Sequence, residues 1–208
     1  MKAAFKHVLL TRFNIRVPEW RDTDKNGLTV LDDTWMIHRI DLFQKFTVPS
    51  VLEQTSKNFS WIVLADEATH PRFKEELEAL PFYEVLYVKD WLVDLQSRLK
   101  GKGWLATTRL DNDDVIHPKF IETIQENVTT KKTHFINLTN GYTLHGHKLR
   151  PKHHAANPFM TLVEKGPDIK SIYFMPHGRA MRKHGPIVQV TEGRLWTQII
   201  HERNYINE

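Results

Sequence analysis

The stretch WLATTRLDNDD, residues 104–114, carries the two features that decide the fold of this chain. Apart from Arg109, its first part is apolar or β-branched, as expected of a strand that is buried on both faces. It then ends in Asp111, Asp113 and Asp114, three acidic residues within four positions. Polar residues at the carboxyl end of a buried strand are typical of open α/β sheets, which bind their ligands at that edge.

The segments around this stretch alternate between strand-like and helix-like patterns. Strands are predicted at 7–13, 59–65 and 83–88, and helices at 35–43, 71–80, 90–99 and, after Pro118, up to about Asn127. This alternation predicts an α/β fold in which a mostly parallel, Rossmann-like sheet is flanked by helices.

The second half of the chain is less regular. Strands are predicted at 134–138, 142–149 and 171–175, and an amphipathic helix at 195–203. No internal repeat, low-complexity segment or long linker divides the sequence, so a single domain over residues 1–208 is predicted.

Composition excludes several classes of protein. Of the 208 residues, 40% are hydrophobic, which excludes a disordered chain, and the absence of Cys excludes disulfides and thiolate metal sites. No apolar run approaches the roughly 18 residues of a membrane span, and no secretory signal is recognisable, so we expect a cytoplasmic protein. The net charge of +4 fits an anionic ligand but does not choose between a nucleotide, a nucleic acid and a membrane surface.

The three carboxylates must be held together by a cation, by protons or by strong hydrogen bonds, because they repel one another. Oxygen ligands of this kind suit Mg²⁺ or Mn²⁺, which bridge to phosphates. Arg109 adds a cation that can bind a phosphate or pair with the acids. The alternative is that Asp113 or Asp114 caps the helix that follows.

Two other metal-using motifs fit the sequence less well. An EF-hand loop needs Gly at the position of Ile116 and is interrupted by Pro118. A phosphatase that forms an aspartyl phosphate needs a downstream acidic pair, yet Asp168 is the only Asp after Asp114.

The acidic stretch resembles the Asp-x-Asp signature of nucleotide-sugar glycosyltransferases with the GT-A fold, and the chain resembles in particular the family described as putative rhamnosyltransferases. The resemblance runs from about His7 to Asn207 and depends on the order and spacing of several blocks. These blocks are HVLLTRFN (7–14), RIDLF (39–43), PSVLEQT (49–55), FSWIVL (59–64), TRLDNDD (108–114), NPF (157–159) and WTQIIH (196–201) with Asn204.

The resemblance implies a GT-A-like domain with a nucleotide-binding half, residues 1–117, and an irregular acceptor-side half, residues 118–208. It implies a hexosyltransferase of rhamnosyltransferase type, which moves a sugar from a nucleotide-diphosphate-sugar donor to a carbohydrate-type hydroxyl acceptor with the help of Mn²⁺ or Mg²⁺. A nucleic-acid partner is not expected, whereas peripheral contact with a membrane is compatible with the sequence.

The resemblance also implies roles for individual residues. Asp113 would bind the metal directly, as a catalytic residue, and Asp111 would lie near the ribose and the metal. A further metal ligand is expected from a His near the C-terminus, with His177 as the first candidate and His201 as the second. The remaining nucleotide-binding residues are expected to be Thr11, Arg12, Phe13, Asn14, Asp66 and Arg109.

Glu164 is expected to be the general base that deprotonates the acceptor hydroxyl. The Glu-Asp pair of many inverting members is missing, because Lys165 follows Glu164. Core packing for Phe13 and turn formation for Asp66 are alternatives to nucleotide binding. For the whole chain, the alternatives are an inactive module that binds nucleic acid or glycan on the same fold, and a Mg²⁺-dependent phosphatase.

Overall fold

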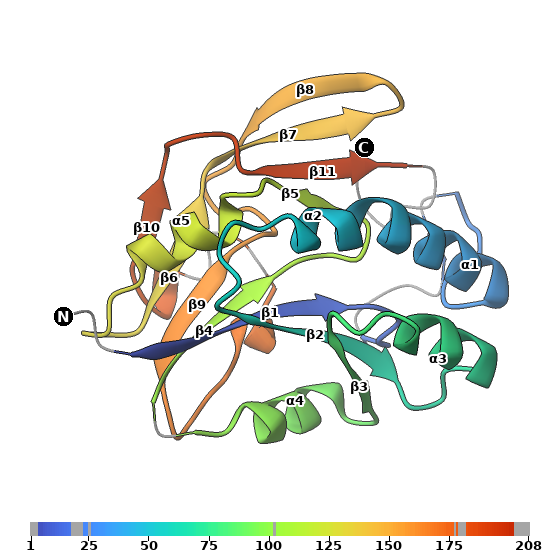
Figure 1. Ribbon diagram of the computed structural model, residues 1–208, viewed down its shortest axis with the longest axis horizontal. Coiled ribbons are helices and arrows are strands. Elements are labelled where there is room, and N and C mark those ends of the chain that lie inside the picture. The colour runs from blue at the N-terminus through green and yellow to red at the C-terminus, as the bar shows by residue number, and fades with distance from the viewer. Residues whose placement is uncertain are drawn as a thin grey trace.

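The computed structural model describes residues 4–17, 23–24, 26–101, 103–176, 178 and 182–201. Its main sheet has seven strands in the order β10-β6-β9-β4-β1-β2-β3 (Figure 1). The strands are β1 (Phe5–Arg12), β2 (Ser60–Asp66), β3 (Glu84–Val88), β4 (Trp104–Arg109), β6 (His134–Leu138), β9 (Thr161–Lys165) and β10 (Ile187–Val190).

Neighbouring strands of the main sheet are parallel except where β9 lies between β4 and β6 and is antiparallel to both. The predicted mostly parallel α/β sheet is therefore confirmed. Strands from both sides of residue 117 make up this sheet, so the two halves expected from the sequence share one hydrogen-bonded layer.

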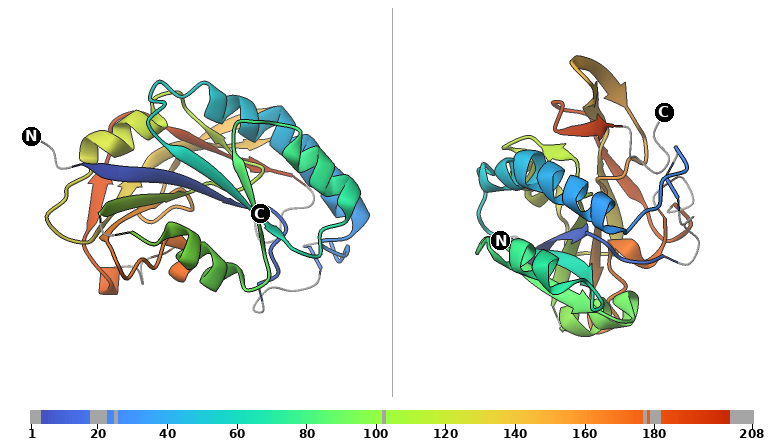
Figure 2. Two further views of the ribbon diagram at one scale, coloured as in Figure 1. Left: turned by 60° about the horizontal axis from the view of Figure 1, so that its bottom comes forward. Right: turned by 90° about the vertical axis from the view of Figure 1, so that its right-hand side faces the viewer.

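Helices cover both faces of the main sheet (Figures 1 and 2). On one face, α1 (Asp33–Leu42), α3 (Pro71–Glu78) and α5 (Phe120–Asn127) bury apolar side chains in one core cluster, and on the other face α4 (Trp91–Leu99) does the same in a second cluster. Asp32 begins α1 by accepting a hydrogen bond from the amide of Trp35 at 2.7 Å.

Side chains of β1 alternate between the two cores, as the two-residue period of a strand requires. Leu9 and, just beyond the strand, Phe13 pack on the α1 side, whereas Val8 and Leu10 pack on the α4 side. The same alternation in β4 sends Ala106 to the α1 side and Leu105 to the α4 side. This alternation decides which residues of the strand ends remain available to a ligand.

A second sheet of four strands, in the order β5-β11-β7-β8, lies above α2 (Val48–Leu52) in Figure 1. Its strands are β5 (Val115–Ile116), β7 (Asn140–His145), β8 (Lys148–His153) and β11 (Trp196–Ile200). Gly141 of β7 lies under the indole of Trp196, and a Cβ at this position would overlap the ring. Only a glycine lets β7 and β11 approach in this way.

Three predicted elements of the second half are corrected by the structure. Within the described part of the helix predicted at 195–203, the chain forms the strand β11, because this short apolar run finds ladder partners in β5 and β7. Residues 202 and 203 lie outside the described residues. The strand predicted at 171–175 is a 3₁₀ turn over Ile172–Phe174. The strand predicted at 142–149 is the hairpin of β7 and β8, which turns at Gly146 with φ of 57°.

Within the described part of the chain, none of the helices combines the length and the apolar character needed to cross a bilayer.

We predict that His7 makes the stability of the fold depend on pH. Its buried ring lies 2.8 Å from the hydroxyl oxygen of Thr108, and burial lowers its pKa from 6.5 to about 3. Because the folded pKa is the lower one, the stabilisation is complete above pH 6.5 and is lost as the pH falls from 6.5 toward 3. The loss approaches about 1.4 kcal/mol per pH unit.

Urea unfolding of the wild type and of His7→Gln between pH 7.5 and pH 5 measures this effect. We expect the free energy of unfolding of the variant to fall less steeply with decreasing pH, because Gln does not titrate. His147→Gln, in the exposed turn of the hairpin, is the matched control and keeps the wild-type slope. Parallel pH profiles for the wild type and His7→Gln would show that His7 does not titrate as described.

Candidate functional site

The candidate site lies at the edge of the main sheet where β1, β2 and β4 end. Since these three strands are parallel, their last residues, Arg12, Asp66 and Arg109, lie along the same edge. The acidic loop at 111–114 continues directly from β4 at this edge. The sheet therefore brings together most of the polar residues that the sequence predicts for a nucleotide site.

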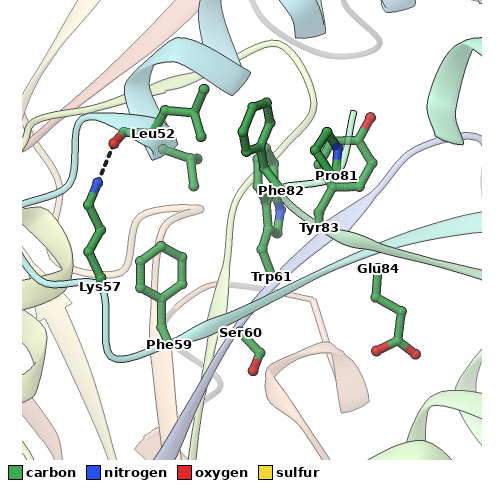
Figure 3. A pocket seen from close by; sticks show the side chains of 10 residues that line it. Leu52, Lys57, Phe59, Ser60, Trp61, Pro81, Phe82, Tyr83 and Glu84 are labelled. Carbon is green, nitrogen blue, oxygen red and sulfur yellow. Dashed lines mark hydrogen bonds between the residues drawn. The ribbon is translucent and has the colours of Figure 1, made fainter. Parts of the chain in front are cut away.

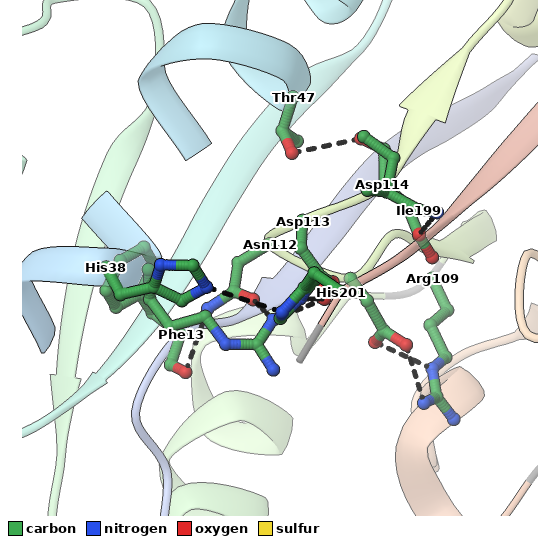
Figure 4. Close-up of polar contacts among 11 residues, drawn as sticks. Phe13, His38, Thr47, Arg109, Asn112, Asp113, Asp114, Ile199 and His201 are labelled. Atoms are coloured by element: carbon green, nitrogen blue, oxygen red, sulfur yellow. Dashed lines mark hydrogen bonds and ion pairs between the residues drawn. The ribbon is translucent and has the colours of Figure 1, made fainter. Parts of the chain in front are cut away.

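Asp113 is buried and is bound by two side chains from distant parts of the chain (Figure 4). Its Oδ2 atom forms an ion pair with the guanidinium of Arg39 and lies 2.9 Å from Nε2 of His201. Burial alone would raise the pKa of this carboxyl, but the charge of Arg39 and the hydrogen bond from His201 lower it to about 2. Asp113 is thus an ionised group inside the protein with its own counter-charge.

Arg39 connects α1 to the acidic loop. Besides its ion pair with Asp113, its Nη1 atom donates a hydrogen bond of 3.0 Å to the side-chain oxygen of Asn112. The amide nitrogen of the same Asn112 donates to the carbonyl oxygen of Phe13 at 3.1 Å. One helix, the acidic loop and the end of β1 are therefore joined by a single chain of polar contacts.

A π-helical turn, η1 (Phe43–Thr47), follows α1 and leads into α2 (Val48–Leu52). The hydroxyl of Thr47 donates a hydrogen bond of 2.9 Å to the carbonyl oxygen of Asp114. Such wide turns inside helices are frequent at functional sites, since they change which residues face one side. The same helical unit therefore holds the acidic loop at two points, Arg39 and Thr47.

Asp114 has a structural role that joins the loop to the second sheet. Its Oδ1 atom accepts a hydrogen bond of 2.9 Å from the backbone amide of Ile199 in β11. Burial, together with the charges of Asp113 and Asp111, raises the pKa of Asp114 well above its ordinary value. The helix-capping alternative is not supported, because α5 begins after Lys119 and the amide of Ile121 in its first turn donates to the side-chain oxygen of Gln54 at 3.0 Å.

A second polar cluster combines Arg12, Arg109, Asp111 and Tyr173. Arg109 binds Asp111 through two contacts, from Nε at 3.2 Å and from Nη2 at 3.1 Å. The guanidinium carbons of Arg12 and Arg109 lie 4.5 Å and 5.5 Å from the centre of the Tyr173 ring. Burial and then the neighbouring charge of Arg109 lower the pKa of Arg12. Two guanidinium groups therefore lie close together beside one carboxylate.

Asn14 and Asp66 line a hollow of about 200 Å³ at the ends of β1 and β2. The side-chain oxygen of Asn14 accepts a hydrogen bond of 3.1 Å from the backbone amide of Asp66. The Asp66 carboxylate accepts a hydrogen bond of 2.8 Å from the amide of Ala68, as in an Asx turn. Asp66 therefore forms the turn that shapes the hollow and lines it as well.

Two of the predicted nucleotide-binding residues pack into the core instead. The hydroxyl of Thr11 accepts a hydrogen bond from the Trp61 indole at 3.1 Å, and the ring of Phe13 lies edge-on to Phe43 with centroids 5.3 Å apart. Both residues are buried on the α1 face because of the alternation along β1. Packing was the alternative open for Phe13, and the structure favours it.

Glu164 does not lie at the candidate site. In β9 it faces Leu105 near the beginning of β4, at the opposite edge of the sheet from Asp111. Its carboxylate accepts hydrogen bonds from the amides of Lys170 and Ser171 at 2.9 Å and 2.8 Å, and burial raises its pKa. The residue predicted as the general base therefore lies away from the acidic loop, because β9 runs antiparallel to β4.

The two His candidates have different outcomes. His177 lies outside the described residues. His201, the second candidate, contacts Asp113, and its Nδ1 atom lies 3.3 Å from Nε2 of His38 in α1. Figure 4 shows His38 and His201 next to Asn112 and Asp113. The structure thus brings a C-terminal His to the acidic loop, as the resemblance implies for one of the two.

The described residues do not fit a site for Mn²⁺ or Mg²⁺. Asp111 is oriented toward Arg109, and the Oδ2 atom of Asp113 is shared by Arg39 and His201. Within the described ranges, no three His, Asp or Glu side chains converge as metal ligands would. A bound Mn²⁺ or Mg²⁺ stays a prediction from the sequence.

Four residues of the site were not predicted from the sequence to have a role there: Arg39, His38, Asn112 and Tyr173. Arg39 stands 73 positions before Asn112, and no local spacing relates it to the acidic loop. The one available signal is its place in the RIDLF block, which carries the family resemblance without indicating a role.

A larger hollow, of about 410 Å³, lies at the opposite edge of the sheet (Figure 3). It is lined by residues at the beginnings of β2 and β3, among them Phe59, Trp61 and Tyr83. Aromatic side chains make up much of its lining, which also includes Lys57 and Glu84, and none of the polar residues at the carboxyl ends of the strands lines it. This hollow is therefore not part of the candidate site.

Comparisons with known proteins agree with this architecture. A family model described as "Putative rhamnosyl transferase" matches residues 6–208. No curated protein matches the chain in sequence. The structure of S. aureus TarS 1–349 in complex with UDP-GlcNAc matches with a TM-score of 0.51 at 11% identity, over 96% of this chain and 60% of that one.

The structure of S. aureus TarS 1–349 in complex with UDP matches with a TM-score of 0.45 at 11% identity, over 96% of this chain and 61% of that one. This chain thus spans less than two thirds of the TarS length. The match with a TM-score of 0.51 shows a similar fold, which confirms the GT-A-like architecture predicted from the sequence.

We predict that Arg39 and Asp113 stabilise the fold only as a pair. Arg39→Met leaves a buried carboxylate without its main counter-charge, which is expected to cost about 3–5 kcal/mol of unfolding free energy. Adding Asp113→Asn removes that charge and is expected to restore much of the loss. Urea unfolding of both single variants and the double variant gives the coupling energy.

The matched control is the exposed pair of Arg98 and Glu84, which is bidentate but lies on the surface. Arg98→Met is expected to cost about 1 kcal/mol or less. If the costs of Arg39→Met and Asp113→Asn simply add, the buried pair does not exist in solution.

Proposed function

The chain belongs to the putative rhamnosyl transferase family, and from that premise we propose that it transfers a sugar from a nucleotide-diphosphate-sugar donor to a hydroxyl group of a carbohydrate-type acceptor. One observation carries the proposal. The ends of three parallel strands bring two features to one edge of the sheet: a small hollow lined by Asn14 and Asp66, and a pair of guanidinium groups at Arg12 and Arg109. A nucleoside with a charged diphosphate is the kind of ligand that such an edge suits.

The hollow beside Asn14 and Asp66 is proposed to bind the nucleoside. Its volume of about 200 Å³ is below the range of about 300–1,000 Å³ typical of sites for whole drug-sized ligands. It therefore suits one ring of a nucleotide, base or ribose, with the rest of the donor lying along the sheet edge. The Asp66 carboxylate, which lines the hollow, is proposed to accept a hydrogen bond from that ring.

The diphosphate is proposed to lie toward Arg12 and Arg109, at the ends of the two neighbouring strands β1 and β4. In the transfer step, the acceptor oxygen forms a bond to the anomeric carbon while the bond from that carbon to the diphosphate breaks. The acceptor proton passes to a base, and the nucleoside diphosphate leaves with the bonding electron pair. Positive charge next to the leaving oxygen is what most lowers the barrier.

The donor is proposed to carry a hexose of rhamnosyl type, in line with the family description. Glu164 is not proposed as the base, because it lies at the other edge of the sheet. The structure of S. aureus TarS 1–349 that shares this fold is a complex with UDP-GlcNAc. A nucleotide sugar is thus bound by a protein of this fold, and a donor of this kind is proposed for this chain.

We predict that a nucleoside diphosphate stabilises the protein against heat. A ligand at about 100 times its Kd adds about 2.7 kcal/mol to the free energy of unfolding, which a thermal-shift screen detects. The screen uses nucleoside diphosphates and their sugar conjugates. Release of the nucleoside diphosphate from the best conjugate, with a mixture of sugars as acceptors, then measures transfer. Binding without release in any mixture would favour a module that has kept the fold but lost turnover.

We also predict that Asp66→Asn weakens binding of the best nucleoside diphosphate about 10-fold, since one hydrogen bond to a charged group is lost. Asp168→Asn is the control, because Asp168 is exposed and follows β9 at the other edge of the sheet. Isothermal titration measures both. Equal affinities for the wild type and Asp66→Asn would show that the nucleoside does not bind in this hollow.

A further inference from the structure

The proposed transfer requires a positive charge beside the donor diphosphate, and we propose that arginine side chains provide it in place of a divalent cation. This inference depends on the function proposed above. Arg12 and Arg109 are proposed to bind the diphosphate. Arg39 is proposed to take the place that a metal ion would have beside the carboxylate of Asp113. Binding of a nucleoside diphosphate should then be independent of Mn²⁺ and Mg²⁺.

The first argument is the balance of charge at the sheet edge. The sequence alone shows three aspartates in four positions, which indicates a site that attracts a cation. Arg109 stands beside them in the sequence, and the fold adds Arg12 and Arg39 to the same edge of the sheet. Among the described residues, three guanidinium groups thus accompany the three carboxylates, which offsets the negative charge that would hold a divalent cation.

The second argument is the geometry at Asp113. A metal ion bound by the acidic loop would take the Oδ2 atom of Asp113, which already binds Arg39 and lies 2.9 Å from His201. Arg39 is itself buried and is held by Asn112 through a hydrogen bond of 3.0 Å. A divalent cation at Asp113 would therefore lie next to the guanidinium of Arg39. Because this group is buried, water would screen the repulsion between the two positive charges only weakly.

The third argument is the arrangement of Arg12 and Arg109. Both side chains lie on the α4 face of the sheet, where they pack against the ring of Tyr173. Arg109 uses Nε and Nη2 for Asp111, and its Nη1 atom carries two further N–H donors. Two like charges held together by packing repel each other, and an anion bound between them removes that repulsion.

Guanidinium groups match the chemistry of a diphosphate. Their planar donors bind phosphate oxygens in pairs, and they keep their charge at any physiological pH. Tyr173 fixes one face of each group, so little side-chain freedom is lost when the anion binds. The cluster therefore has the charge and the donors required for the diphosphate without a bridging ion.

The test is isothermal titration of the wild-type protein with the nucleoside diphosphate that gave the largest thermal shift. One titration is carried out in excess EDTA and the other in excess Mn²⁺. We expect the two Kd values to agree within about twofold. A parallel titration with Mn²⁺ alone, followed by the electron paramagnetic resonance of free Mn²⁺, is expected to show no site that depends on Asp113.

Two results would overturn the inference, and they differ in what they say about the proposed function. Binding that is at least 10-fold tighter in Mn²⁺ than in EDTA overturns the arginine proposal and leaves donor binding intact. Absence of binding for every nucleoside diphosphate in both buffers overturns the proposed function together with this inference. Neither result depends on a variant that might fail to fold.

Variants test whether the diphosphate binds at the cluster of Arg12 and Arg109. Arg109→Leu is expected to weaken binding of the nucleoside diphosphate about 10- to 100-fold and to leave binding of the nucleoside without phosphates unchanged. Arg98→Leu, which removes the exposed ion pair between the last turn of α4 and Glu84 of β3, is the control and is expected to bind both ligands as the wild type does. Equal diphosphate affinity in Arg109→Leu, confirmed as folded by circular dichroism, contradicts the assignment.

Discussion

The arrangement of this protein depends on one buried ion pair, between Arg39 and Asp113. A carboxylate buried without a partner would strongly destabilise the fold, so the acidic loop can close over the sheet only if Arg39 reaches it. Through Asn112, His201 and Phe13, the same contact fixes the loop to β1 and to the strand β11. The site and the packing of the second sheet are therefore stabilised by the same group of side chains.

This dependence changes what the acidic motif does. In the sequence, three neighbouring aspartates form a motif that suits a metal ion. In the fold, each carboxylate has a different partner: Arg109 for Asp111, Arg39 with His201 for Asp113, and the amide of Ile199 for Asp114. The motif thus joins several elements at the sheet edge, and Arg12 lies next to the Arg109–Asp111 pair on the α4 face.

The position of the site followed from local patterns, whereas the list of its residues did not. Period-two alternation and the apolar run before Asp111 locate the strand ends, and the loop at 111–114, Asn14 and Asp66 lie where these patterns place them. Thr11 and Phe13 are buried in the core instead, because successive residues along β1 point to opposite faces of the sheet and these two point to the α1 face. Glu164 lies away from the site because β9 is antiparallel to β4, and the sequence of a five-residue strand does not indicate in which direction it will pair.

The sequence by itself determined the α/β class, the edge at which polar residues gather and, through the spacing of its blocks, the family. These features depend on neighbours along the chain, and hydrophobic periodicity records such neighbours directly. Only the tertiary structure decided which partner each carboxylate has and whether residues 196–200 form a helix or a strand. The reason is physical: an ion pair or a β ladder gains its energy from groups that are far apart in sequence, and no local pattern encodes their meeting.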